Sequence, residues 1–173
     1  MSSRLPAPRH TFRVPCEYSK SRLYFEVRIY NNAADLQRVA AVNGGHSLRR
    51  LAHTKGICQP FGIRRYPDKK ERAAGQRART QPICGRILFT HTYLNSMVIA
   101  HEVAHAAIAY AERRGFLVNE PGDGQFVGAG EERFCRVLGD MVGLIYWNLM
   151  KLGYATVINP AKRKTGRVFT QSH

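Results

Sequence analysis

The sequence predicts an α+β domain in which a small antiparallel sheet packs on two central helices. Two segments predict strands, because Arg22–Tyr30 (RLYFEVRIY) and Ile83–Tyr93 (ICGRILFTHTY) are rich in aromatic and β-branched residues. Two long helical segments follow the second strand, at about 96–114 and 131–152. With 173 residues, 44% of them hydrophobic, the chain is long enough to bury a moderate core as one domain.

The chain divides into three parts on this interpretation. Residues 1–17 contain three prolines and predict a flexible basic arm, because proline removes the hydrogen bonds that a helix or a sheet needs. Residues 18–153 form the single domain. Residues 154–173 form a basic C-terminal tail.

Capping residues set the expected helix boundaries. An asparagine at 31 or 32 begins a helix over 33–42, which stops at Gly44. Residues 46–82 contain several Gly and Pro and predict a long basic loop with a short helix near 69–79. Asn95 or Ser96 caps the first long helix, and Gly115 ends it.

Charge is spread unevenly along the chain. The 27 Lys and Arg exceed the 12 Asp and Glu and give a net charge of +15. Residues 1–95 hold 18 basic and 5 acidic side chains, whereas residues 96–173 hold 9 and 7. The basic half predicts a nucleic acid or an acidic protein as partner, or else a solvated surface, since no helix-turn-helix, zinc finger or aromatic platform is legible.

Several protein classes are excluded by composition. No stretch reaches the roughly 18 uninterrupted apolar residues of a membrane span, and the start does not resemble a secretory signal. Cys16, Cys58, Cys84 and Cys135 are too far apart in sequence for a Cys-x-x-Cys pair. We therefore expect free thiols in a cytoplasmic protein.

The first long helix carries the motif His101-Glu102-Val103-Ala104-His105. Two histidines four apart lie on one helix face, so both imidazoles can bind one metal ion. Glu102 can approach the open coordination position and take a proton from zinc-bound water. Because the flanking residues are apolar, we expect a buried helix, in which these polar groups need an organising metal. The alternative is a histidine pair satisfied by other groups of the core.

Catalytic zinc requires a third protein ligand. The second long helix begins with Glu131 and Glu132, and we favour Glu132 because small residues follow it on one face and would permit close approach to the histidine helix. Those small residues are Cys135, Gly139 and Gly143. The alternative for both glutamates is a carboxylate pair stabilised by the helix dipole.

The chain resembles zincin metallopeptidases of the gluzincin type over about residues 83–152. The His101–His105 motif matches in full, and Glu132-Arg133-Phe134-Cys135 is similar to the glutamate helix of that group. The short length looks most like the repressor-cleaving ImmA/IrrE-type proteases and other small metallopeptidases of phages and plasmids. The acidic residue often found four positions after the ligand glutamate is Arg136 here, so the usual hydrogen bond from a ligand histidine lacks its carboxylate acceptor.

The expected function is zinc-dependent hydrolysis of peptide bonds in a protein substrate, with one zinc per chain held by His101, His105 and Glu132 and with Glu102 as general base. The alternative is a basic nucleic-acid- or partner-binding protein with a structural or inert zinc site. Minor candidates are His91 as a substrate contact and Tyr93 or Tyr110 as oxyanion donors, although aromatic packing is the preferred role for both tyrosines. His46 and His53 are expected to be solvated.

Overall fold

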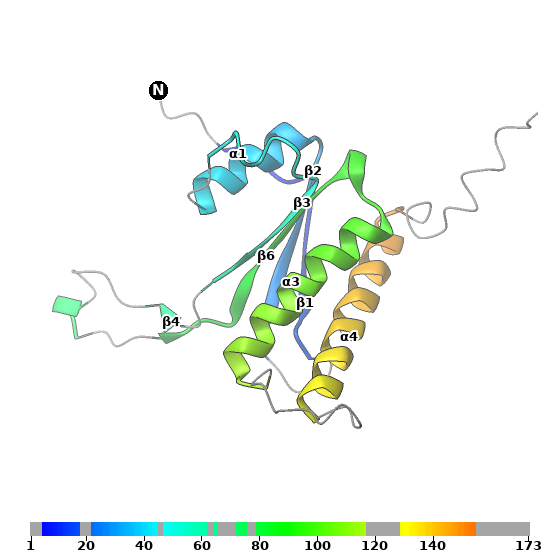
Figure 1. The fold of residues 1–173 in the computed structure, drawn as a ribbon. Coiled ribbons are helices and arrows are strands. Elements are labelled where there is room, and N and C mark those ends of the chain that lie inside the picture. The colour runs from blue at the N-terminus through cyan, green and yellow to red at the C-terminus, as the bar shows by residue number, and fades with distance from the viewer. Residues whose placement is uncertain are drawn as a thin grey trace, which may run out of the picture.

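The protein is an α+β structure in which a four-stranded mixed sheet lies between helices (Figure 1). The computed structural model describes residues 5–17, 22–44, 47–61, 64–65, 72–75, 79–116 and 129–154. The strands follow the order β1-β2-β6-β3 across the sheet. Their bounds are β1 His10–Pro15, β2 Tyr24–Tyr30, β3 Gly56–Pro60 and β6 Ile83–Thr90.

The helices cover the two faces of this sheet unequally (Figure 1). The long helices α3 (Ser96–Arg114) and α4 (Ala129–Lys151) pack on one face and enclose the main core. Helix α1 (Ala33–Gly44) packs on part of the other face, over a smaller cluster that includes Tyr30 and Leu88. A two-stranded hairpin, β4 (Arg64–Arg65) with β5 (Arg79–Thr80), and a short 3-10 helix η1 (His91–Tyr93) complete the described elements.

The α+β class and the two predicted long helices are confirmed. Helix α3 begins where the Asn95 side chain accepts a hydrogen bond from Val98 N–H at 3.0 Å. It ends at Gly115, whose φ of 68° is the left-handed conformation that glycine adopts without a steric penalty. Local sequence chemistry therefore sets both ends of the helix that carries the histidine motif.

The predicted all-antiparallel pairing is wrong for one strand pair. Strands β2 and β6 run parallel, whereas β1 pairs with β2 and β3 pairs with β6 in antiparallel fashion. A parallel pair needs a long crossover, and the chain from β2 to β6 supplies one through α1 and β3. The sheet is consequently mixed.

Two strands lie where the sequence predicted none. His10–Pro15 is strand β1, so the expectation of a flexible arm over residues 1–17 is wrong there, and Pro15 is tolerated because it ends an edge strand. Gly56–Pro60 is strand β3, inside the segment predicted as a loop. Most of the predicted short helix near 69–79 and of the tail 154–173 lies outside the described residues.

No helix among the described residues combines the length and the apolar character that crossing a membrane requires.

Substitution of Gly85 in β6 tests how closely β3 packs on the sheet. A Cβ there would lie 2.5 Å from the Gln59 carbonyl oxygen and 2.8 Å from Pro60 Cα, and backbone atoms cannot move aside easily. We expect Gly85→Ala to lower the free energy of unfolding by about 1–3 kcal/mol. Gly139→Ala is the matched control, because its Cβ would meet nothing within 4 Å on helix α4, and it should stabilise by about 0.5–1 kcal/mol. Urea unfolding followed by circular dichroism measures both, and equal effects would contradict this packing.

Candidate metal centre

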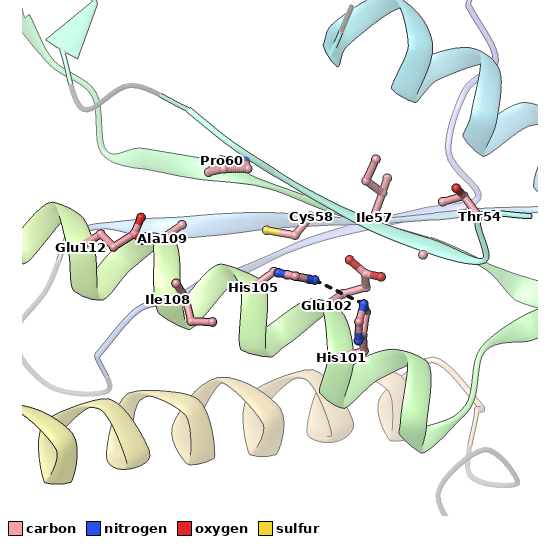
Figure 2. A pocket seen from close by; sticks show the side chains of 11 residues that line it. Thr54, Ile57, Cys58, Pro60, His101, Glu102, His105, Ile108, Ala109 and Glu112 are labelled. Atoms are coloured by element: carbon pink, nitrogen blue, oxygen red, sulfur yellow. Dashed lines mark hydrogen bonds between the residues drawn. The ribbon is translucent and has the colours of Figure 1, made fainter. Parts of the chain in front are cut away.

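The histidine motif lies in the first half of helix α3, where the helix passes beneath strand β3 (Figure 2). Val103, Ala106 and Ala107 are fully buried in the core, and this burial fixes the rotation of the helix about its axis. His101 and His105 are consequently turned outward and are exposed, while Glu102 is directed toward β3 with 6% of its surface exposed.

The two imidazoles converge on a common point. His101 Nε2 and His105 Nε2 are 3.3 Å apart, with the rings nearly perpendicular at 87° (Figure 2). Two nitrogens that each lie about 2.0–2.1 Å from one zinc ion, at the tetrahedral angle, are separated by about 3.3–3.4 Å. The spacing of the pair therefore fits two ligands of a tetrahedral zinc ion.

Glu102 is buried between α3 and β3, where its side chain lies against Gly56. Burial raises the pKa of its carboxyl above the ordinary value, while the charges of His101 and His105 and a hydrogen bond from the backbone N–H of Cys58 act in the opposite direction. A carboxyl whose pKa is raised above the ordinary value is a stronger base than a solvated carboxylate, and the Cys58 N–H holds it in place.

A cleft of about 420 Å³ runs along α3 beside the motif. One wall is a stripe of outward residues on α3, namely His101, His105, Ile108 and Glu112. The other wall is strand β3 together with Thr54, which lies two residues before the strand; the strand contributes Gly56, Ile57, Cys58 and Pro60 (Figure 2). A second hollow of about 430 Å³ continues past His101 and is lined by His53, Lys55 and Met97 among others.

Strand β3 is an edge strand of the sheet, and its outward backbone groups face this cleft, with the Cys58 N–H already bonded to the Glu102 carboxylate. Phe61 N–H donates to the Cys84 carbonyl oxygen at 2.7 Å, and the register pairs Gln59 with Arg86. In an antiparallel pair every second residue makes the ladder bonds, so the backbone groups of Gly56 and Cys58 point away from β6. Pro60 has no N–H to leave unpaired, which suits an edge strand.

The described residues do not bring a third ligand to the histidine pair. No group of three or more His, Cys, Asp and Glu side chains that could hold a metal ion is found in the part of the chain that the structure describes. Glu131 and Glu132 are both exposed in the first turn of α4. Arg133 anchors that turn, because its Nε and Nη2 donate to Glu17 Oε1 at 2.8 and 2.6 Å.

The structure does not support the packing argument that favoured Glu132 over Glu131 as the third metal ligand. A Cβ on Gly139 or Gly143 would meet nothing within 4 Å, so this small-residue face of α4 is turned to open space and not to α3. On the stripe that includes Glu131, Leu138 and Val142 pack against the core, and Tyr146 makes a hydrogen bond with Ser96 of α3. The choice between Glu131 and Glu132 therefore remains a prediction.

The minor candidates fall outside the cleft or at its margin. His91 packs edge-on against Tyr154, with ring centroids 5.4 Å apart, and does not line the cleft described above. Tyr110 is fully buried. Tyr93 is exposed, and Lys55 Nζ lies 5.2 Å from the centroid of its ring. His53 is exposed as expected, and His46 lies outside the described residues.

Sequence reasoning missed the wall that β3 contributes. The only signal was the short segment Gly56–Pro60, in which glycine precedes a β-branched residue and proline stands at the end. Five residues are too few to show the alternation that identifies a strand.

Comparison with protein-family models, with curated proteins and with solved structures found no match to this chain. The function is therefore inferred from the side chains of the site themselves.

The alkylation rate of the Cys58 thiol measures how tightly β3 packs against α3. Burial and the neighbouring Glu102 carboxylate raise its pKa from 9.0 to about 12, whereas Cys135 is exposed on α4. Because the thiolate is the reactive form, we expect iodoacetamide at pH 8 to alkylate Cys135 rapidly and Cys58 at least about a hundredfold more slowly. Peptide mass spectrometry over time measures both rates in one sample. Equal labelling would show that the cleft wall is open.

Proposed function

We propose that this protein is a zinc-dependent metallopeptidase that hydrolyses peptide bonds of a protein substrate. One observation carries the proposal: two imidazole nitrogens 3.3 Å apart lie beside a buried glutamate of raised pKa, at the open edge of a sheet. Each of these three features suits one part of the reaction.

His101 and His105 would hold the metal, with Glu132 as the proposed third ligand and Glu131 as its alternative. A zinc ion bound there supplies a Lewis acid and a bound water whose pKa is near 7. The segment that joins α3 to α4 lies outside the described residues. The variants described below test which of the two glutamates binds the metal.

Glu102 would move the proton. Its carboxylate accepts the proton of the attacking water and then returns it to the departing amine, and a pKa raised by burial strengthens it as a base for the first of these steps. The Cys58 N–H holds the carboxylate in place, so the proton acceptor is oriented before a substrate arrives.

The outward edge of β3 supports a peptide as the substrate. The N–H and C=O of Gly56 and the C=O of Cys58 are donors and acceptors with which an extended peptide pairs when it adds to a sheet, whereas the Cys58 N–H is bonded to Glu102. A chain bound in this way would lie along the cleft, directly across from the histidine pair.

The free state of all four cysteines supports a reducing compartment, and we propose the cytoplasm. A second candidate function is a basic binding protein with a structural or inert zinc site. The exposed position of Glu131 and Glu132, away from any described three-ligand group, favours this candidate.

Metal content is the first test. We expect one zinc per chain in protein purified after zinc-replete expression, measured by plasma emission spectrometry. His101→Ala and His105→Ala should each lose most of the metal, because the remaining two ligands bind too weakly. Wild-type protein without zinc would refute the proposal.

Paired glutamate variants identify the third ligand in the same assay. We expect Glu132→Ala to lose zinc and Glu131→Ala to keep it, with circular dichroism to verify folding. The opposite result assigns the ligand to Glu131. Retention of zinc in both single variants and in the double variant would exclude either glutamate as a ligand.

Glu102→Gln separates catalysis from metal binding. Glutamine has nearly the same shape but cannot accept a proton, so we expect zinc content to be retained and cleavage to fall by about 10²–10⁴-fold. Substrates are found by comparing the intact proteomes of cells that express the wild type or this variant. A substrate is then assayed with purified protein.

Two outcomes of that assay would contradict the assigned role. Loss of zinc from Glu102→Gln would make Glu102 a structural residue. Cleavage at the wild-type rate would show that another base acts. A zinc-loaded wild type that changes no protein in the proteome comparison would favour the binding-protein alternative.

A further inference from the structure

The second hollow beside the histidine motif has an exposed lysine in its wall. This hollow, of about 430 Å³, is lined by Lys55, His53 and Met97 together with His101 and Glu102 of the motif. Among the described residues that line it, Lys55 is the only Lys or Arg and Glu102 is the only carboxylate. Because Glu102 is buried, with 6% of its surface exposed, the hollow presents a positive charge to a substrate.

Local contacts hold Lys55 in place. Its carbonyl oxygen accepts a hydrogen bond from Thr90 Oγ1 at 3.3 Å, and Thr90 is fully buried in β6. Its Nζ lies 5.2 Å from the centroid of the Tyr93 ring, which is a cation–π contact. An ammonium group has three N–H donors, so the ring contact leaves donors for a carboxylate. The backbone and the side chain of Lys55 are thus both positioned before a substrate binds.

The opposite end of the cleft carries a negative charge. Glu112 is exposed in the last turn of α3 and lines the first hollow together with Ile108. Figure 2 shows Glu112 at the far end of the labelled residues from Thr54, which precedes Lys55 in the chain. Glu112 lies eleven residues after His101, or about 16 Å along the helix axis. An extended peptide covers that distance with about five residues.

Pairing with β3 would orient a substrate relative to these charges. Strand β3 already pairs with β6 in antiparallel fashion, and antiparallel pairing is slightly more stable per residue than parallel pairing. A peptide that adds antiparallel to β3 has its carboxyl end toward Gly56 and its amino end toward Pro60. Lys55 directly precedes Gly56, so side chains on the carboxyl side of the scissile bond reach the lysine. Side chains on the amino side reach Glu112 instead.

We infer that the protein cleaves peptide segments that carry an acidic residue close to the scissile bond on its carboxyl side. This inference rests on the proposed function, because it names the substrate class of the same site. Lys55 would bind the acidic side chain through a charge-assisted hydrogen bond. Glu112 would repel the same side chain at the other end of the cleft, so the preference is confined to one side.

The chemistry and the net charge agree with such a substrate. The cleavage is a hydrolysis in which the C–N bond breaks, water adds OH to the carbon and H to the nitrogen, and no oxidant or reductant is needed. A net charge of +15 favours an acidic protein as partner. That acidic partner would here be the substrate itself.

A peptide library tests the inference. Zinc-loaded wild-type protein digests peptides with randomised central positions, and mass spectrometry locates the cleaved bonds. We expect Asp and Glu to be enriched within about two positions on the carboxyl side of the cleaved bond. In matched peptides, replacement of the acidic residue by its amide should lower kcat/KM about two- to fivefold, since one solvent-exposed ion pair contributes about that much.

Charge reversal at Lys55 identifies the group that recognises the acidic residue. Lys55→Glu should invert the preference, so that a peptide with Lys at this position is cleaved faster than one with Glu. Lys151→Glu makes the same change of charge at an exposed position of α4 and should keep the wild-type preference. Binding gives a readout that does not need cleavage: fluorescence anisotropy of the labelled peptides with Glu102→Gln should rank them in the same order. Thermal melts verify that each variant is folded.

The outcomes separate this inference from the proposed peptidase. Cleavage without an acidic preference, or with that preference on the amino side, would overturn the inference but not the peptidase activity. An unchanged preference in Lys55→Glu would overturn it as well. Absence of all cleavage by zinc-loaded protein would refute the peptidase. In that case, binding of the acidic peptides to Glu102→Gln that is lost on adding Lys55→Glu would still support the contact, and absence of such binding would overturn it too.

Discussion

The close contact between Glu102 and the edge strand β3 constrains the rest of the site. A Cβ on Gly56 would lie 2.9 Å from Glu102 Cγ and 2.9 Å from Val98 Cγ1, so α3 can approach the strand this closely only because position 56 has no side chain. The approach buries a carboxyl group, which is unfavourable unless the charge is compensated. The Cys58 N–H and the two imidazoles supply that compensation.

The contact with β3 on one side and the core on the other side together fix the rotation of α3 about its axis. Glu102 must face β3, and Val103 and Ala106 must face the core, so His101 and His105 are turned to solvent on the cleft side. The same geometry brings the outward edge of β3 alongside the histidines. The absence of a side chain at Gly56 thus brings the proposed proton acceptor, the proposed metal ligands and the proposed peptide-binding edge together.

The two sides of the sheet differ in the charged groups that they carry. Its α3 side carries the cleft, with Glu102 and Glu112 near the histidine pair. On the opposite side, the Glu26 carboxylate bridges the guanidinium groups of Arg28 and Arg86.

Local chemistry made α3 predictable from the sequence: Asn95 caps its start, Gly115 ends it with φ 68°, and the His101–His105 spacing places both rings on one face. Tertiary structure alone decided which elements surround that helix. Strand β3 was not predicted because five residues show no clear period, and its position depends on pairing with β6. The rotation of α4 was not predicted because small residues permit close packing but do not require it. Local signals act within a few residues, whereas pairing and packing depend on partners far away in the chain.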